Sequence, residues 1–185
     1  ILGPGTYLFN VMAHYATTTE LVEGGQLLLL NTGGKVSLNA RVMLEGPYSP
    51  ITGTMSDALR ANGLLPLSQP YTALGYTFTA ADTGMTSAPV LANGDANNAI
   101  VDWVIVELRS TANSGLVVSS RSALLQRDGD IVGLNGTSTL WMAVPEGSYH
   151  VAVRHRDHLG VMTANPVPLT ALPTSIDLSS PAIST

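Results

Sequence analysis

Residues 120–163, SRSALLQRDGDIVGLNGTSTLWMAVPEGSYHVAVRHRDHLGVMT, decide the fold of this chain, together with AIVDWVIVEL at residues 99–108. Short apolar runs alternate here with turn residues. The Asp-Gly pair at 128–129 and the Asn-Gly pair at 135–136 strongly indicate β-hairpin turns. Residues 99–108 are nearly apolar on both faces, which is typical of a central strand covered on each side. These patterns predict antiparallel strands joined by tight turns.

Further strands are predicted on both sides of these stretches. Residues 36–44 alternate between apolar and polar side chains, as a half-buried strand does. Residues 139–144 and 149–155 have strand composition, and prolines confine a strand at 167–169 to the edge of a sheet. We therefore predict an all-β fold, an antiparallel β-sandwich of immunoglobulin-like or jelly-roll-like type.

The segment between the first strand and the central strand is predicted to be mostly irregular. Residues 56–61 can form one helical turn, with Ser56 as its cap. Residues 76–78 can form a short strand, and the polar stretch 79–98 is predicted to be a long loop.

The chain divides into two parts by composition. Residues 1–34 form an apolar block with strand-like runs at 6–15 and 25–30, and residues 35–185 form the sandwich module. The block is expected to be either a strand donated to another sheet or the end of a preceding domain. Because the sequence begins at Ile1 without a signal-peptide pattern, we expect a processed or excised piece.

Composition excludes several classes of function. Charged residues make up 11% of the 185 residues, against a usual share of about 25%. The net charge is −5, and Lys35 is the one lysine, so we expect no nucleic-acid partner. No apolar run approaches the length of a membrane span, so we expect no membrane insertion. The absence of cysteine excludes disulfides and thiolate chemistry.

The densest group of charged and titratable residues is the run Arg154, His155, Arg156, Asp157 and His158. Strand alternation sends His150 and His155 to opposite faces, and the flanking arginines would repel a cation, so we expect no metal here. We interpret the cluster as structural. The arginines are expected to pair with carboxylates such as Asp128 or Asp130, or to bind carbonyls.

Two other features are candidate binding sites. Asp128, Asp130 and Asp95 lie in acidic turns that could hold calcium, although none continues into an EF-hand pattern, so the turns themselves are the simpler interpretation. Trp141 is a candidate for stacking on a sugar, whereas Trp103 lies in an apolar strand and is expected in the core.

Catalytic motifs are absent from the sequence. It contains no Gly-x-Ser-x-Gly elbow and no carboxylate pair arranged for acid–base work. We expect no enzyme activity and no cofactor. An enzyme with an unrecognised site, which would require His155 or His158, is kept as a third alternative.

Five phrases in the chain carry a resemblance to a known group of modules. They are VSLNARVMLEGPY from residue 36, MSDALRANGLLPLSQPY from 55, IVDWVIVELR from 100, SRSALLQRDGDIV from 120 and YHVAVRHRDHLGVMT from 149. The stretch 36–170 resembles a β-sandwich module near the C-terminal ends of large adhesin-like or haemagglutinin-like surface proteins of Bacteroidota exported by type IX secretion. The resemblance implies an extracellular, cell-surface location in bacteria, and it implies no catalytic residue.

Two functions stay open from the sequence. The first is a non-catalytic structural or adhesin-like module, including the self-assembling subunit of a surface filament, whose partners are copies of itself or neighbouring domains. The second is a carbohydrate- or ligand-binding module appended to a surface protein or hydrolase, with glycans as partners.

Overall fold

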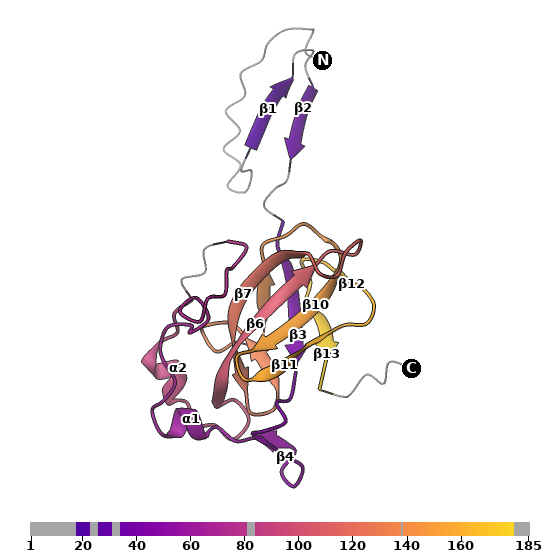
Figure 1. Cartoon of the computed structure of the whole chain (residues 1–185). Helices are drawn as coiled ribbons and strands as arrows, with labels where there is room; N and C mark the ends of the chain where they lie inside the picture. The colour runs from indigo at the N-terminus through magenta and orange to yellow at the C-terminus, as the bar shows by residue number, and fades with distance from the viewer. Residues whose placement is uncertain (1–17, 23–25, 31–33, 81–83, 138, 180–185) are drawn as a thin grey trace.

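The structure is a computed structural model that describes residues 18–22, 26–30, 34–80, 84–137 and 139–179 (Figure 1). Most of this part of the chain is in strands, and the helices are short. The strands are β1 Thr18–Val22, β2 Gln26–Leu30, β3 Val36–Arg41, β4 Tyr48–Ser49, β5 Thr54–Met55, β6 Ile100–Arg109, β7 Val117–Gln126, β8 Asp130–Val132, β9 Leu140–Met142, β10 Gly147–His155, β11 His158–Met162, β12 Val167–Leu169 and β13 Thr174–Asp177. The helices are α1 Ala58–Ala61 and α2 Ala88–Ala92. No helix in the described residues is long and apolar enough to cross a membrane.

One large sheet forms the body of the molecule. Its strand order is β11-β10-β6-β7-β8-β3-β13, with β12 added beside β10 and β9 beside β3. The pairs are antiparallel except β13 with β3. The sheet curls so that β3 approaches β12 again, where the Ser37 N–H donates to the Thr170 carbonyl at 2.8 Å. The predicted all-β, sandwich-like fold is confirmed.

The inside of this curl holds the main hydrophobic core. Alternate residues of β3, β6, β7 and β10 point into it, as the period of two in each strand requires. Its largest fully buried members include Leu38, Leu108, Leu125 and Leu140. The alternation predicted for 36–44 is therefore confirmed, because Val36, Leu38, Ala40, Val42 and Leu44 all lie in this core.

Strand β6 is buried on both faces, as its apolar sequence predicted. Its second face carries another apolar cluster around Ile100, Trp103 and Ile105. Residues 56–80 and 84–98 cover that face with α1, α2 and the loops around them, as Figure 1 shows beside β6 and β7. Tyr71 connects this covering layer to the sheet through a 2.6 Å hydrogen bond from its hydroxyl to the Trp103 carbonyl.

Several local predictions were wrong in this covering layer. Residues 79–98, predicted as a long loop, contain α2. This helix tolerates Pro89 because the N–H groups of the first helical turn have no partner within the helix, so the missing N–H of proline costs no hydrogen bond there. Residues 76–78 form no strand, and the rings of Tyr76 and Phe78 instead pack against the second cluster. The N-cap of α1 is Asp57 and not Ser56.

Two turns follow the sequence closely. Gly129 and Gly136 both adopt positive φ, at +97° and +78°, within the two predicted turns. At the first turn the Asp128 carboxylate accepts a hydrogen bond from the Asp130 N–H at 3.1 Å, which closes the turn locally.

The N-terminal block contributes a separate hairpin. Strands β1 and β2 pair with each other as an antiparallel two-stranded sheet. The strand-like run 25–30 therefore contains a strand, whereas the run 6–15 lies outside the described residues.

Candidate functional site

The arginine–histidine cluster sits at one end of the large sheet, where β10 turns into β11. His155 and His158 are cross-strand partners, and Arg156 and Asp157 form the two-residue turn between them. Such a short connection fixes the positions of the side chains at the ends of the two strands. Because β10 also pairs with β6, these positions are fixed relative to β6 as well. The cluster therefore faces the polar residues of β6.

Asp102 of β6 is the centre of the first polar group. Its two carboxylate oxygens accept hydrogen bonds from Arg156 at 2.6 Å each and from the Trp103 N–H at 2.7 Å. The His155 Nε2 atom lies 3.1 Å from the same carboxylate. Burial raises the pKa of Asp102, but the hydrogen bonds from His155, Trp103 and Arg156 more than offset it, so the pKa lies below its ordinary value.

Glu107 is the centre of a second polar group on the same strand. It is fully buried and accepts hydrogen bonds from Arg109, from Arg154 at 3.3 Å and from the Tyr76 hydroxyl at 2.7 Å. Burial raises the pKa of Tyr76 to about 12, with the Glu107 charge contributing in the same direction. Glu107 thus ties together β6, β10 and the covering segment.

The expected acid partners of the two arginines were wrong. Arg156 and Arg154 pair with Asp102 and Glu107, and not with Asp128 or Asp130. The reason is register, because β10 lies beside β6, whereas the turn at 128–130 lies beyond β7. The structural interpretation of the cluster agrees with these contacts, since both arginines bond buried carboxylates.

The candidate calcium residues lie in two turns. Asp95 accepts hydrogen bonds from the N–H groups of Asn97 and Asn98, and Asp128 accepts one from Asp130. Burial and the neighbouring Asp128 charge raise the pKa of Asp130. Across the described residues, no three His, Cys, Asp or Glu side chains converge as a set of metal ligands.

The two histidines of the cluster form a contact that strand alternation did not predict. The Nδ1 atoms of His155 and His158 lie 2.9 Å apart, and the Asp157 N–H donates to the same His155 nitrogen at 3.2 Å. The His155 side chain is 5% exposed, and His158 is half-buried. Both line a hollow of about 180 Å³ together with Glu45, Met43 and several apolar residues.

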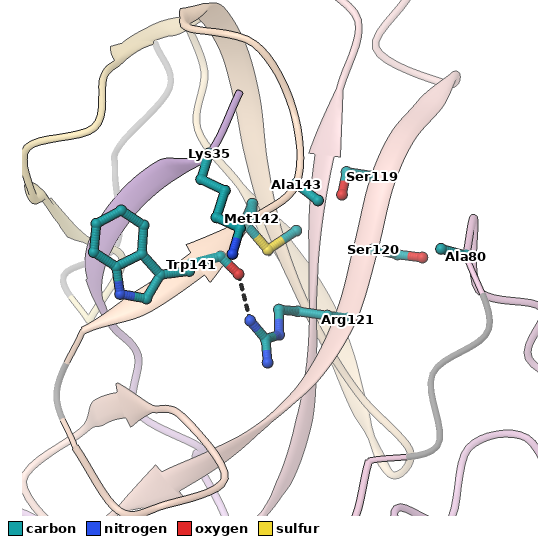
Figure 2. Close-up of a pocket in the computed structure, with 8 residues that line it drawn as sticks. All are labelled: Lys35, Ala80, Ser119, Ser120, Arg121, Trp141, Met142 and Ala143. Carbon is teal, nitrogen blue, oxygen red and sulfur yellow. Dashed lines mark hydrogen bonds between the residues drawn. The ribbon is translucent and has the colours of Figure 1, made fainter. Parts of the chain in front are cut away.

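Trp141 lines a different and larger hollow of about 330 Å³ (Figure 2). Its side chain is 43% exposed on β9, whereas Trp103 is fully buried, as predicted. In Figure 2 the side chains of Lys35 and Arg121 reach toward the Trp141 carbonyl, and the indole stands at the margin of the group. The Arg121 guanidinium donates a hydrogen bond to that carbonyl. Ser119, Ser120, Ala80, Met142 and Ala143 complete the lining.

This hollow is positively charged. Lys35 and Arg121 have no carboxylate within ion-pair distance in the described part of the chain, and the lining contains no acidic residue. An exposed indole beside two cations that form no ion pair can contact the flat apolar face of a ligand while the cations bind a negatively charged group of the same ligand. The sequence predicted Trp141 as a candidate residue but not Lys35 or Arg121. Lys35 lies just before β3 and Arg121 lies in β7, and only the fold brings these two segments together.

Comparison of the chain with family models, curated proteins and solved structures finds no match.

Proposed function

We propose that this chain is a non-catalytic, adhesin-like module of an extracellular bacterial surface protein, and that it binds an acidic carbohydrate at the Trp141 hollow. The observation that carries the proposal is the combination of Trp141, Lys35 and Arg121 around one opening. The extracellular location rests on the resemblance of residues 36–170 to surface-protein modules.

The chemistry of the hollow selects the class of ligand. The indole offers a face on which the C–H surface of a sugar ring can stack. Lys35 and Arg121 supply positive charge that no carboxylate balances among the described residues, which favours a sugar that carries a carboxylate or sulfate group. Ser119 and Ser120 add hydroxyl groups to the same lining.

The experiment is a screen of neutral, carboxylated and sulfated glycans, followed by titration calorimetry of the best ligand. We expect binding of acidic glycans that weakens at least tenfold, about 1.4 kcal/mol, in Trp141→Ala and in Arg121→Gln. Tyr48→Ala is the matched control, because Tyr48 is also an exposed aromatic residue, at 39%, but lies outside this hollow. Equal binding by the wild type and Trp141→Ala, or no binding at millimolar ligand, would contradict the proposal.

A second candidate function is self-assembly by strand addition, and the edge strand β11 favours it. Strand β11 pairs with β10 alone among the described strands. It exposes Leu159, Val161 and Met162, of which Leu159 is 97% exposed. An exposed apolar edge of this kind can accept a strand from another copy, and the apolar N-terminal block is the proposed donor.

Negative-stain microscopy and light scattering test this second candidate. We expect oligomers or fibres from the full chain, and their loss on deletion of residues 1–30 or in Val161→Lys, which places a charge on the accepting edge. Ile51 is 94% exposed in the connection between β4 and β5 and is not part of β11, so Ile51→Lys is the control. An oligomer unchanged by the deletion would rule out the N-terminal block as donor.

A further inference from the structure

We propose that His155 and His158 form a binding site for a late first-row divalent metal ion, with Cu²⁺ bound most tightly. The two side chains meet across the two-residue turn between β10 and β11. Their Nδ1 atoms lie 2.9 Å apart and share one proton, because two bare lone pairs would repel each other at this distance. A metal ion that replaces this proton releases it to solvent.

The separation of the nitrogen atoms selects the metal. A bond from a metal ion to an imidazole nitrogen is about 2.0–2.1 Å long. Two such bonds to atoms 2.9 Å apart enclose an angle of about 90° at the metal. Neighbouring ligands in square-planar and octahedral complexes make this angle, whereas tetrahedral Zn²⁺ requires about 109°. The geometry therefore favours Cu²⁺ and Ni²⁺, of which Cu²⁺ binds such ligands more tightly.

Asp102 supplies the outer support that a metal-binding histidine requires. The carboxylate lies 3.1 Å from the His155 Nε2 atom, on the far side of the ring from Nδ1. It is held in turn by Arg156 and by the Trp103 N–H. A carboxylate at this position holds the hydrogen on Nε2 and leaves the Nδ1 lone pair available to a metal ion.

The charge around the pair allows a cation. Arg154 and Arg156 flank His155 in the sequence, but Arg156 pairs with Asp102 and Asp157, and Arg154 shares the Glu107 carboxylate with Arg109. Glu45 lines the same hollow as the two histidines and has no ion pair among the described residues. These ion pairs reduce the repulsion of a cation that the sequence led us to expect from the arginines.

The hollow determines what completes the coordination. Because no third protein ligand converges on the pair in the described residues, water fills the remaining positions. Binding also displaces the Asp157 N–H from the His155 Nδ1 atom, where it now donates at 3.2 Å. The site is consequently a two-histidine site open to solvent on one side, and it is separate from the Trp141 hollow.

The test is titration of the full chain, without a polyhistidine tag, with Cu²⁺, followed by electron paramagnetic resonance. We expect one tight equivalent of Cu²⁺ with hyperfine structure from two nitrogen ligands. His158→Ala is expected to lower the affinity at least about tenfold and to leave one nitrogen ligand. His158 is the variant of choice because it is half-buried, and thermal unfolding checks that the variant folds.

Two control variants separate this site from the other histidines. His150 bonds the Thr163 carbonyl through its own Nδ1 atom, and His14 lies outside the described residues. His14→Ala, His150→Ala and Trp141→Ala are all expected to bind Cu²⁺ as the wild type does. Copper affinity that is unchanged in His158→Ala, or the absence of a tight equivalent in the wild type, overturns the proposal and leaves the pair a structural contact of the hairpin.

Discussion

At the scale of single residues, the two buried acids of β6 stand out. Asp102 and Glu107 lie in a strand whose other side chains are almost all apolar, and each is matched by arginines from β10 or the adjoining turn. A buried carboxylate is tolerated only when charge and hydrogen bonds replace its lost hydration. The cluster therefore fixes β10 against β6 in one register.

Asp102→Asn is predicted to destabilise the fold. Asparagine keeps one acceptor oxygen but replaces the other with an NH2 group and removes the charge that balances the Arg156 guanidinium, which costs about 3 kcal/mol in the free energy of unfolding. Asp157→Asn is the matched control, because Asp157 also pairs with Arg156 but its side chain is 70% exposed, and a loss below about 1 kcal/mol is expected. Urea unfolding of both variants measures the difference, and equal losses would contradict the role given to Asp102.

The same carboxylate predicts how stability depends on pH. Because the folded pKa of Asp102 is lower than its unfolded value of about 3.9, its contribution is fully present above that pH. The contribution is lost as the pH falls through the folded pKa. The stability difference between the wild type and Asp102→Asn should therefore shrink below about pH 4. A difference that stays constant down to pH 2 would contradict the prediction, because it would show that the pKa of Asp102 does not change on folding.

At the scale of elements, the hairpin β7–β8 depends on a turn that few residues can form. Gly129 has φ of +97°, and a Cβ atom at this position would lie 2.8 Å from the Val42 carbonyl oxygen. The turn thus requires glycine both for its backbone conformation and for the close approach of the chain after β3.

Gly129→Ala is predicted to cost more stability than a comparable glycine change elsewhere. Gly53 also has positive φ, at +68°, but nothing lies within 4 Å of its added Cβ. Gly53→Ala should cost about 1 kcal/mol from backbone strain alone. Gly129→Ala should cost about 1–3 kcal/mol beyond that, because the β7–β8 turn must shift away from the backbone. Thermal or urea unfolding of the pair tests this, and equal losses would mean that the turn absorbs the clash.

At the scale of the whole molecule, the sandwich is built from residues after the N-terminal block. Among the residues whose side chains the structure describes, both hydrophobic clusters draw their members from residues 36–178, and β1 and β2 pair only with each other among the described strands. A unit that contains two such hydrophobic clusters is expected to fold alone.

The chain of residues 35–185 is therefore predicted to fold without the N-terminal block. Its unfolding temperature should lie within about 3 °C of that of the full chain, which corresponds to a change of less than about 1 kcal/mol. Circular dichroism at increasing temperature measures this. A much larger loss would show that residues 1–34 contribute to the core, and light scattering on the same two proteins reports whether the block links copies.

The sequence by itself determined the strands whose pattern is local. The apolar run of β6, the alternation of β3 and the Asp-Gly turn before β8 were all predicted. Burial on one or two faces produces alternating or continuous apolar residues, and a turn with positive φ favours glycine, so both can be recognised from consecutive residues. Helix α2 and the parallel pairing of β13 with β3 were not, because a five-residue helix has little periodicity and a long-range pair has no local signature.

Only the tertiary structure decided which polar groups meet. The sequence does not specify which acid pairs with Arg156. The strand order places Arg156 beside Asp102 and not beside Asp130. The same holds for Lys35 and Arg121 beside Trp141, which come from three separate strands or strand ends. Side-chain contacts between distant residues follow from sheet register, and register is set by the packing of the whole core.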